Sequence, residues 1–230
     1  MGVRRHAPLA LVLLFGCGET RREVIDRYRP RMDAMRQKLA ALHEKLPAEL
    51  TPLARELDPK PVYDEETRTG NADFLTEEEL LDVYAKPPFD LTLSVGLKNC
   101  LGWTGSSNPM AESALGERDG TFEADFESAL ATRYLVVLRS RAEEISFQGG
   151  VFSGGDASID AFVIDLGTEE LVAAARVSAS PEGQVSYLVY SGENVDRRGE
   201  AAVHSSTWSN LRPQLGEALE KATGGSFKFR

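Results

Sequence analysis

Residues with catalytic or ligand-binding potential are few and lie far apart along the chain. The most suggestive group is Gly149, Gly150, Gly154, Gly155 and Asp156, because glycine lets a backbone approach a ligand closely. The segment lacks the Gly-Lys-Ser/Thr ending of a phosphate loop and the spacing of a dinucleotide-binding turn. It therefore indicates a flexible connection between strands, with a ligand-contacting loop as the alternative.

A second candidate segment runs from Cys100 to Pro109 and is rich in Gly, Ser and Asn, which predicts a loop. Cys100 could react or form an intermolecular disulfide, although a small buried hydrophobic residue is the commoner role of a lone thiol. Trp103 could line a binding cleft or lie as an aromatic at the edge of the core.

The sequence shows no catalytic constellation. His204 and Ser205 are adjacent, and adjacent side chains rarely face each other; there is also no Gly-x-Ser-x-Gly motif. Helix capping explains Ser205, Ser206 and Ser209 better. Metal-ligand spacing is missing from the three histidines, which are His6, His43 and His204. We therefore expect no enzyme activity, no metal and no cofactor, and keep a hydrolase of unfamiliar type as the least favoured hypothesis.

Asp160 and Asp165 could form a carboxylate pair. Their odd separation places them on opposite sides of a strand, so Asp165, before Leu-Gly, is expected to be a turn residue.

The elements that would position these residues predict an α+β domain over residues 89–230. Alternation predicts a strand at 89–97, and apolar runs predict strands at 134–138 and 185–190. Residues 159–165 and 171–177 form a hairpin around a short turn. Helices are expected at 122–130 and 208–219, the second ending at Gly224-Gly225. The expected fold is a mainly antiparallel sheet of about 4–5 strands covered by helices.

Residues 47–88 hold six of the eleven prolines and several acidic runs, so they predict a linker with one short helix. Thr76 and Glu79 form a capping box for that helix.

An amphipathic helix is expected within residues 17–46. Its apolar stripe has steps of three and four and consists of Ile25, Tyr28, Met32, Met35, Leu39, Leu42 and Leu46. Basic residues flank the stripe, which disfavours a homodimeric coiled coil. Residues 18–46 carry a net charge of +3 and residues 47–230 carry −15. The stripe is therefore expected to pack on the chain's own domain, with a partner protein or anionic headgroups as alternatives.

The whole chain has 230 residues and a formal net charge of −10. This balance argues against general nucleic-acid binding, which needs Lys and Arg to meet phosphates.

The first seventeen residues resemble a secretion signal. Basic residues precede a nine-residue apolar run from Ala7 to Phe15, and Gly16-Cys17 follows; a spanning helix needs roughly 20 apolar residues. Leu14-Phe15-Gly16-Cys17 resembles the lipobox of bacterial lipoproteins. An ordinary signal peptide is the alternative.

The lipobox resemblance implies that residues 1–16 are removed, that Cys17 receives lipid, and that the mature chain is held on a membrane. By the same resemblance, Gly18 after the cysteine favours the outer membrane, with the protein facing the periplasm. The resulting expectation is a non-enzymatic interaction or accessory module of the cell envelope with a possible envelope protein partner. The alternative is a small-ligand-binding lipoprotein that uses the Gly149–Asp156 and Cys100–Trp103 segments.

Overall fold

The computed structural model describes residues 19–67, 69–85, 96–106, 108–142, 146–148, 151–153, 157–181, 183–185 and 194–229. Its fold is α+β, as the sequence predicts. The central sheet has the strand order β3-β4-β7-β8. These strands are β3 (Ala72–Thr76), β4 (Tyr134–Ala142), β7 (Ala157–Asp165) and β8 (Glu170–Ala179). The β3–β4 pair is parallel and the other two pairs are antiparallel.

Two smaller sheets accompany the central one. The first has the order β2-β1-β9 and consists of β1 (Val62–Asp64), β2 (Thr69–Gly70) and β9 (Ser226–Lys228). The second is the hairpin of β5 (Ser146–Gln148) and β6 (Val151–Ser153). The helices are α1 (Arg21–Lys45), α2 (Gly96–Thr104), α3 (Glu112–Leu115), α4 (Phe122–Ala131) and α5 (Val195–Thr223), with a 3-10 turn, η1, at Glu78–Leu80.

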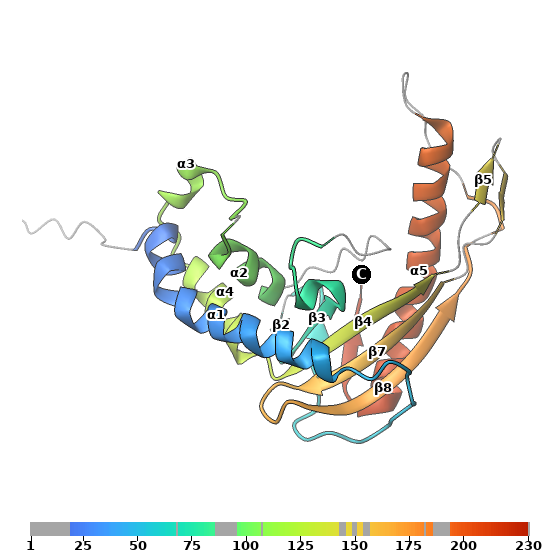
Figure 1. Ribbon diagram of the computed structural model, residues 1–230, viewed down its shortest axis with the longest axis horizontal. Helices are drawn as coiled ribbons and strands as arrows, with labels where there is room; N and C mark the ends of the chain where they lie inside the picture. Colours follow the sequence, from blue (N-terminus) through green and yellow to red (C-terminus); the bar gives the residue numbers. More distant parts are fainter. Residues whose placement is uncertain are drawn as a thin grey trace, which may run out of the picture.

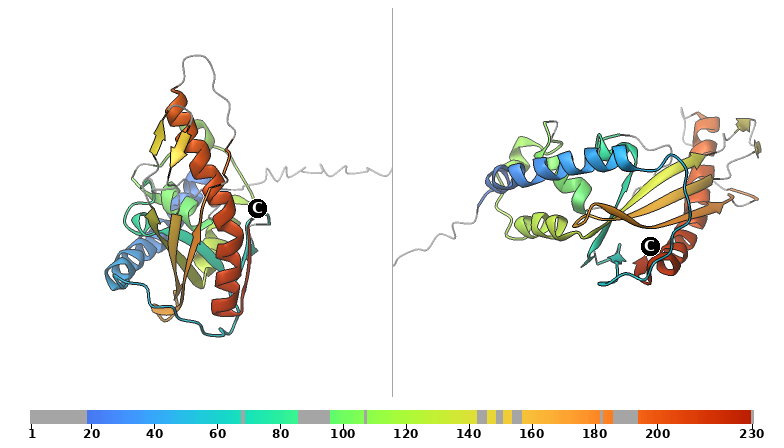
Figure 2. Two further views of the ribbon diagram at one scale, coloured as in Figure 1. Left: turned by 90° about the vertical axis from the view of Figure 1, so that its right-hand side faces the viewer. Right: turned by 60° about the horizontal axis from the view of Figure 1, so that its bottom comes forward.

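Helices cover both faces of the central sheet, with α5 on one face and α1, α2 and α4 on the other (Figures 1 and 2). Successive residues of β4 alternate between the two cores: Val136 packs on the α5 side and Val137 on the α1 side. This burial on both faces explains why residues 134–138 are continuously apolar.

The N-terminal helix packs on the chain's own domain, which confirms the favoured interpretation of its apolar stripe. Met32 and Leu39 are buried in the core that α1 shares with α2 and α4. Thr20 and Glu23 form a complete capping box at its start. The basic flanks meet acidic partners on the body; for example, Arg31 pairs with Glu127 at 3.0 Å. Opposite charges of helix and body therefore face each other.

The structure differs from the predicted linker at residues 47–88. Leu53 exchanges backbone hydrogen bonds with Ala174 on the edge strand β8, and β3 belongs to the central sheet. All five residues of β3 are buried, so the strand shows no alternation by which it could be recognised. The prolines prevent long elements here, yet the short strands β1, β2 and β3 form between them.

The predicted capping box of Thr76 and Glu79 is present, with the Thr76 N–H donating to Glu79 Oε2 at 2.8 Å.

The predicted loop at 100–109 is wrong for its first residues, because α2 extends to Thr104. Its buried residues Leu97, Cys100, Leu101 and Thr104 have helical spacing. The predicted strand at 89–97 is wrong at its end, since Gly96 and Leu97 are helical; its residues 89–95 lie outside the described residues. In the predicted strand at 185–190, Val185 is not in a strand, and 186–190 also lie outside the described residues.

The C-terminal helix is longer than its apolar spacing predicts. Asn194 caps α5 by accepting hydrogen bonds from the N–H groups of Asp196 and Arg197. Ser205, Ser206 and Ser209 therefore lie inside the helix, and the prediction that they cap it is wrong. The predicted end is confirmed: Gly224 follows the last residue in the left-handed conformation, with φ of 70°.

Gly70 of β2 offers a stability test of the β2-β1-β9 sheet. Its φ is +140°, and a Cβ added there would lie 2.0 Å from the carbonyl oxygen of Val62. Gly70→Ala is therefore expected to lower the free energy of unfolding by about 2 kcal/mol or more, as measured by urea denaturation. Gly120 has nothing within 4 Å of an added Cβ, so Gly120→Ala is the matched control. Equal stability of the two variants would contradict this reading of the β1–β2 turn.

Candidate functional site

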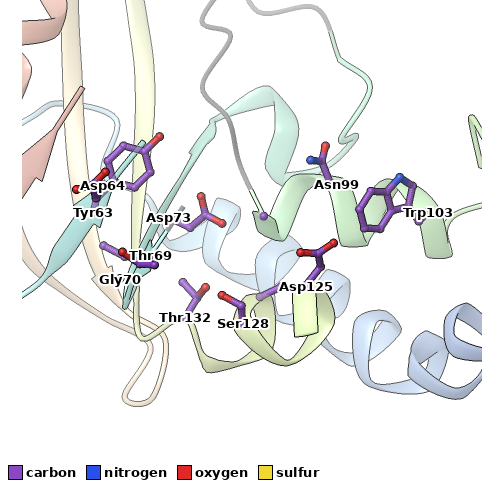
Figure 3. Close-up of a pocket in the computed structure, with 13 residues that line it drawn as sticks. Tyr63, Asp64, Thr69, Gly70, Asp73, Asn99, Trp103, Asp125, Ser128 and Thr132 are labelled. Atoms are coloured by element: carbon purple, nitrogen blue, oxygen red, sulfur yellow. The ribbon is translucent and has the colours of Figure 1, made fainter. Parts of the chain in front are cut away.

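The candidate site is a pocket of about 160 Å³ between the β2-β1-β9 sheet, strand β3 and the helices α2 and α4 (Figure 3). Its lining residues come from four parts of the chain that the sheet and helices bring together. They are Tyr63, Asp64, Thr69, Gly70, Ala72, Asp73, Gly96, Asn99, Trp103, Asp125, Ser128, Ala129 and Thr132. A cavity of this size holds a molecule about as large as benzene, for which ~150 Å³ suffices.

Asp73 is the most deeply buried of the charged lining residues, with 6% of its surface exposed. Its Oδ1 accepts a hydrogen bond from the Phe74 N–H at 2.9 Å, and its Oδ2 accepts one from the Leu97 N–H at 2.8 Å. The second bond satisfies a free N–H group in the first turn of α2. Asp73 thus joins the start of α2 to strand β3.

The environment of Asp73 disfavours its charge. Burial raises the pKa of Asp73 to about 7, against the smaller opposing effect of the hydrogen bonds from Leu97 and Phe74. Within the described parts of the chain, no Lys, Arg or His forms an ion pair with this carboxylate. A group that titrates near neutral pH at the base of a pocket can exchange a proton with a ligand or hold a cation.

The mouth of the pocket is acidic and partly aromatic. Asp125 projects from α4 and Asn99 from α2, and the Asp73 carboxylate points toward the space between these helices (Figure 3). Asp64 lies at the other rim, where hydrogen bonds from Thr67 foremost, and from Glu66, lower its pKa. Three carboxylates and neither Lys nor Arg are found among the lining residues in the described ranges, and one of the three, Asp64, pairs with Lys228 at 3.9 Å. The pocket therefore favours a positively charged ligand.

Trp103 forms an aromatic wall of the pocket on α2 and is held by two rings of α4. Its ring centroid lies 4.8 Å from that of Phe122 and 6.0 Å from that of Phe126. The side chain is half-buried, so part of the indole faces the pocket. An indole face attracts a cation, which agrees with the sign of the nearby charges.

Trp103 is the sequence-derived candidate that the pocket includes. Gly149, Gly150, Gly154, Gly155 and Asp156 lie outside the described residues. The strands that border Gly149 and Gly150 contact α5 at the opposite end of the molecule from α3 and the start of α1 (Figure 1). Gly16 and Cys17 also lie outside the described residues.

The remaining candidate residues from the sequence lie outside the pocket and have structural roles. Cys100 is fully buried, as its favoured interpretation predicts, and burial raises the pKa of its thiol. Asp165 accepts a hydrogen bond from the Gly167 N–H at 2.8 Å, which confirms it as a turn residue. His204 lies within α5, where burial lowers its pKa.

Asp160 is buried in the central sheet between two arginines. Arg141 and Arg176 donate to its carboxylate at 2.8 Å and 2.5 Å. Burial alone would raise the pKa of Asp160, but the contacts with Arg176 and then Arg141 outweigh it and lower the pKa. This carboxylate is therefore compensated within the sheet, in contrast to Asp73.

Sequence reasoning missed Asp73 and Asp125. A charged residue inside the otherwise apolar run Ala72-Asp73-Phe74-Leu75 is the one local signal for Asp73, since a buried strand rarely contains an aspartate. Asp125 lies on an exposed helix face and has no local signal at all.

Comparison with known protein families, curated proteins and solved structures gave no match. Within the described ranges, every helix is too short or too polar to span a bilayer. Nor do three or more His, Cys, Asp or Glu side chains gather there in a way that could hold a metal ion.

Proposed function

We propose that this chain is a lipoprotein of the cell envelope, anchored through lipid on Cys17, whose globular part binds a small cationic ligand without transforming it. Removal of residues 1–16 and an outer-membrane location facing the periplasm belong to the same proposal. The lipobox resemblance supports the anchor. The observation that carries the binding activity is the buried Asp73 carboxylate, which has two backbone hydrogen bonds and no cationic partner among the described residues.

The size and lining of the pocket define the ligand class. A buried carboxylate is costly to ionise unless a cation approaches it, and a protonated amine supplies that charge. Trp103 lines the same pocket, and an indole face attracts a cation by about 0.5–2 kcal/mol. Asn99, Ser128 and Thr132 add hydrogen-bonding groups at the rim. The best match is a primary or secondary amine with a compact apolar body.

Calorimetric titration with benzylamine tests this assignment, with benzyl alcohol as the neutral molecule of the same shape. Saturable binding of benzylamine at pH 8 is expected, with no comparable binding of the alcohol. Asp73→Asn should weaken binding by at least about tenfold, or ~1.4 kcal/mol. Gln37→Ala, on the exposed face of α1, is the control and should bind as the parent does. Equal affinity for the two probes, or no effect of Asp73→Asn, would reject the proposal.

The affinity for benzylamine should also depend on pH. The amine binds the ionised form of Asp73, and protons compete for that carboxylate as the pH falls through its pKa of about 7. We expect about a tenfold loss of affinity between pH 8 and pH 6. Affinity that is constant over this range would show that another group holds the cation.

A second candidate function, docking of an envelope protein, is favoured by one exposed apolar pair. Leu81 is 63% exposed and Tyr84 is 44% exposed after η1, and both border a hollow beside α1. A pull-down from envelope extract would then retrieve a specific partner that is lost with Leu81→Glu. Retention of the same proteins by Leu81→Glu would argue against this surface.

A further inference from the structure

The start of α1 is fixed to the body by several contacts. The Arg21 N–H donates to the Glu117 carbonyl at 2.9 Å, and Thr20 forms an isolated β-bridge with Arg118. The Arg21 guanidinium pairs with Glu117 and Asp119, each at 2.8 Å. The chain is therefore held at residue 20 by backbone and side-chain contacts together, before the long helix begins.

The distance between this fixed point and the lipid-bearing residue is short. Cys17 precedes Thr20 by three residues, and an extended chain spans at most ~3.6 Å per residue, or roughly 11 Å. This is far less than the ~37 Å length of a 25-residue helix such as α1. The body cannot tumble freely above a bilayer on so short a connection.

We infer that one end of the molecule, made of α3, residues 116–121 and the first turn of α1, lies against the lipid surface. The inference rests on the proposed lipidation of Cys17. In Figure 1 this end is on the left, and the β5–β6 hairpin with the start of α5 is on the right. The end that carries the β5–β6 hairpin and the start of α5 therefore points away from the membrane. It is the part that meets soluble molecules of the compartment.

Charge does not produce this orientation. The basic residues of the membrane-facing end are Arg21, Arg22 and Arg118, and the acidic ones in the same segments are Glu23, Glu112, Glu117 and Asp119. Several of them pair with each other, as Arg22 does with Glu112. A polybasic patch would attract anionic headgroups, but this surface has a small negative excess. The acyl chains provide the attachment, and the short tether sets the orientation.

Fluorescence quenching of lipidated protein in phosphatidylcholine vesicles tests the inference. Ser113→Cys on α3 and Ala201→Cys on α5 place thiols at exposed positions, and each is labelled with bimane. The unsubstituted protein controls for labelling of the fully buried Cys100. With a headgroup nitroxide lipid in the vesicles, the label at 113 should lose most of its emission and the label at 201 should keep it. Equal quenching, or stronger quenching at 201, would overturn the orientation.

A longer tether provides the matched control. A Gly-Ser insertion of 20 residues between Gly18 and Glu19 adds a reach of roughly 25 Å, so the difference between the two labels should disappear. Persistence of the difference would mean that the surface itself, and not the tether, binds lipid. Mass spectrometry of the same preparation separates the two proposals. Unmodified Cys17 would overturn both, whereas lipidated Cys17 with equal quenching would overturn the orientation alone.

Discussion

Met32→Ala is expected to lower the free energy of unfolding by about 2–5 kcal/mol. Met32 lies in the middle of the α1 stripe and has no exposed surface. It packs in the core that also contains Leu101 of α2 and Phe126 of α4. Truncation leaves a cavity among helices that the central sheet holds in place, so the surroundings can fill it only in part. Urea denaturation followed by circular dichroism measures the change.

The control for this substitution is Gln37→Ala, which changes an exposed residue of the same helix and should alter stability by less than about 0.5 kcal/mol. A helix that serves mainly to bind another protein would tolerate Met32→Ala almost as well as Gln37→Ala. Similar unfolding midpoints for the two variants would therefore contradict the docking of α1 on its own domain.

The ion pairs of α1 contribute less than its buried stripe. Arg31–Glu127 and Arg27–Glu123 are both at 3.0 Å, and about half of each side chain is exposed. Exposed pairs of this kind are worth about 0–1 kcal/mol each. The apolar stripe therefore holds the helix on the domain, and the charges favour the way in which it lies on the body.

The second large effect is a loss of stability with rising pH caused by Asp73. Its pKa is about 7 in the folded protein and about 3.9 in an unfolded chain. Between these values the folded state binds one more proton than the unfolded state, so stability decreases as the pH rises. The contribution is fully present below pH ~4, and between pH 5 and pH 8 the folded protein should lose about 2.5 kcal/mol from this residue.

Asp73→Asn separates this effect from other titrations. The amide cannot ionise, so the variant should lack this part of the pH dependence, although it also loses a hydrogen bond at every pH. The measured quantity is the difference in unfolding free energy between parent and variant at pH 5 and pH 8. The parent should lose stability relative to the variant as the pH rises. A difference that does not change with pH would show that Asp73 is ionised or neutral throughout.

The elements that periodicity predicts well are those whose partners are close in sequence or whose apolar faces are regular. The stripe from Ile25 to Leu42 predicts α1 and the side that it buries. The β7–β8 hairpin follows from two apolar runs around a four-residue turn. Within that turn Glu169 has φ of 58°, a conformation that the residue types alone do not indicate.

The pocket could not be predicted, because distant residues create it. Strand β3 pairs in parallel with β4, which comes more than fifty residues later in the chain, so no local pattern identifies its partner. The first turn of α2 is capped by Asp73 from that strand, whereas a local N-cap would be visible in the sequence. The sequence supplies Trp103 as a candidate, but the carboxylates around it come from β1, β3 and α4.

We propose that lipid on Cys17 holds this domain at a membrane, and intact-mass spectrometry of protein extracted from bacterial membranes is the decisive test. The predicted result is a chain that lacks residues 1–16 and carries a diacylglycerol and an N-linked acyl chain on Cys17. A Cys17→Ser variant should retain residues 1–16 and gain no lipid mass. An unsubstituted protein with residues 1–16 still present and an unmodified cysteine would mean that the domain is not anchored through lipid on Cys17.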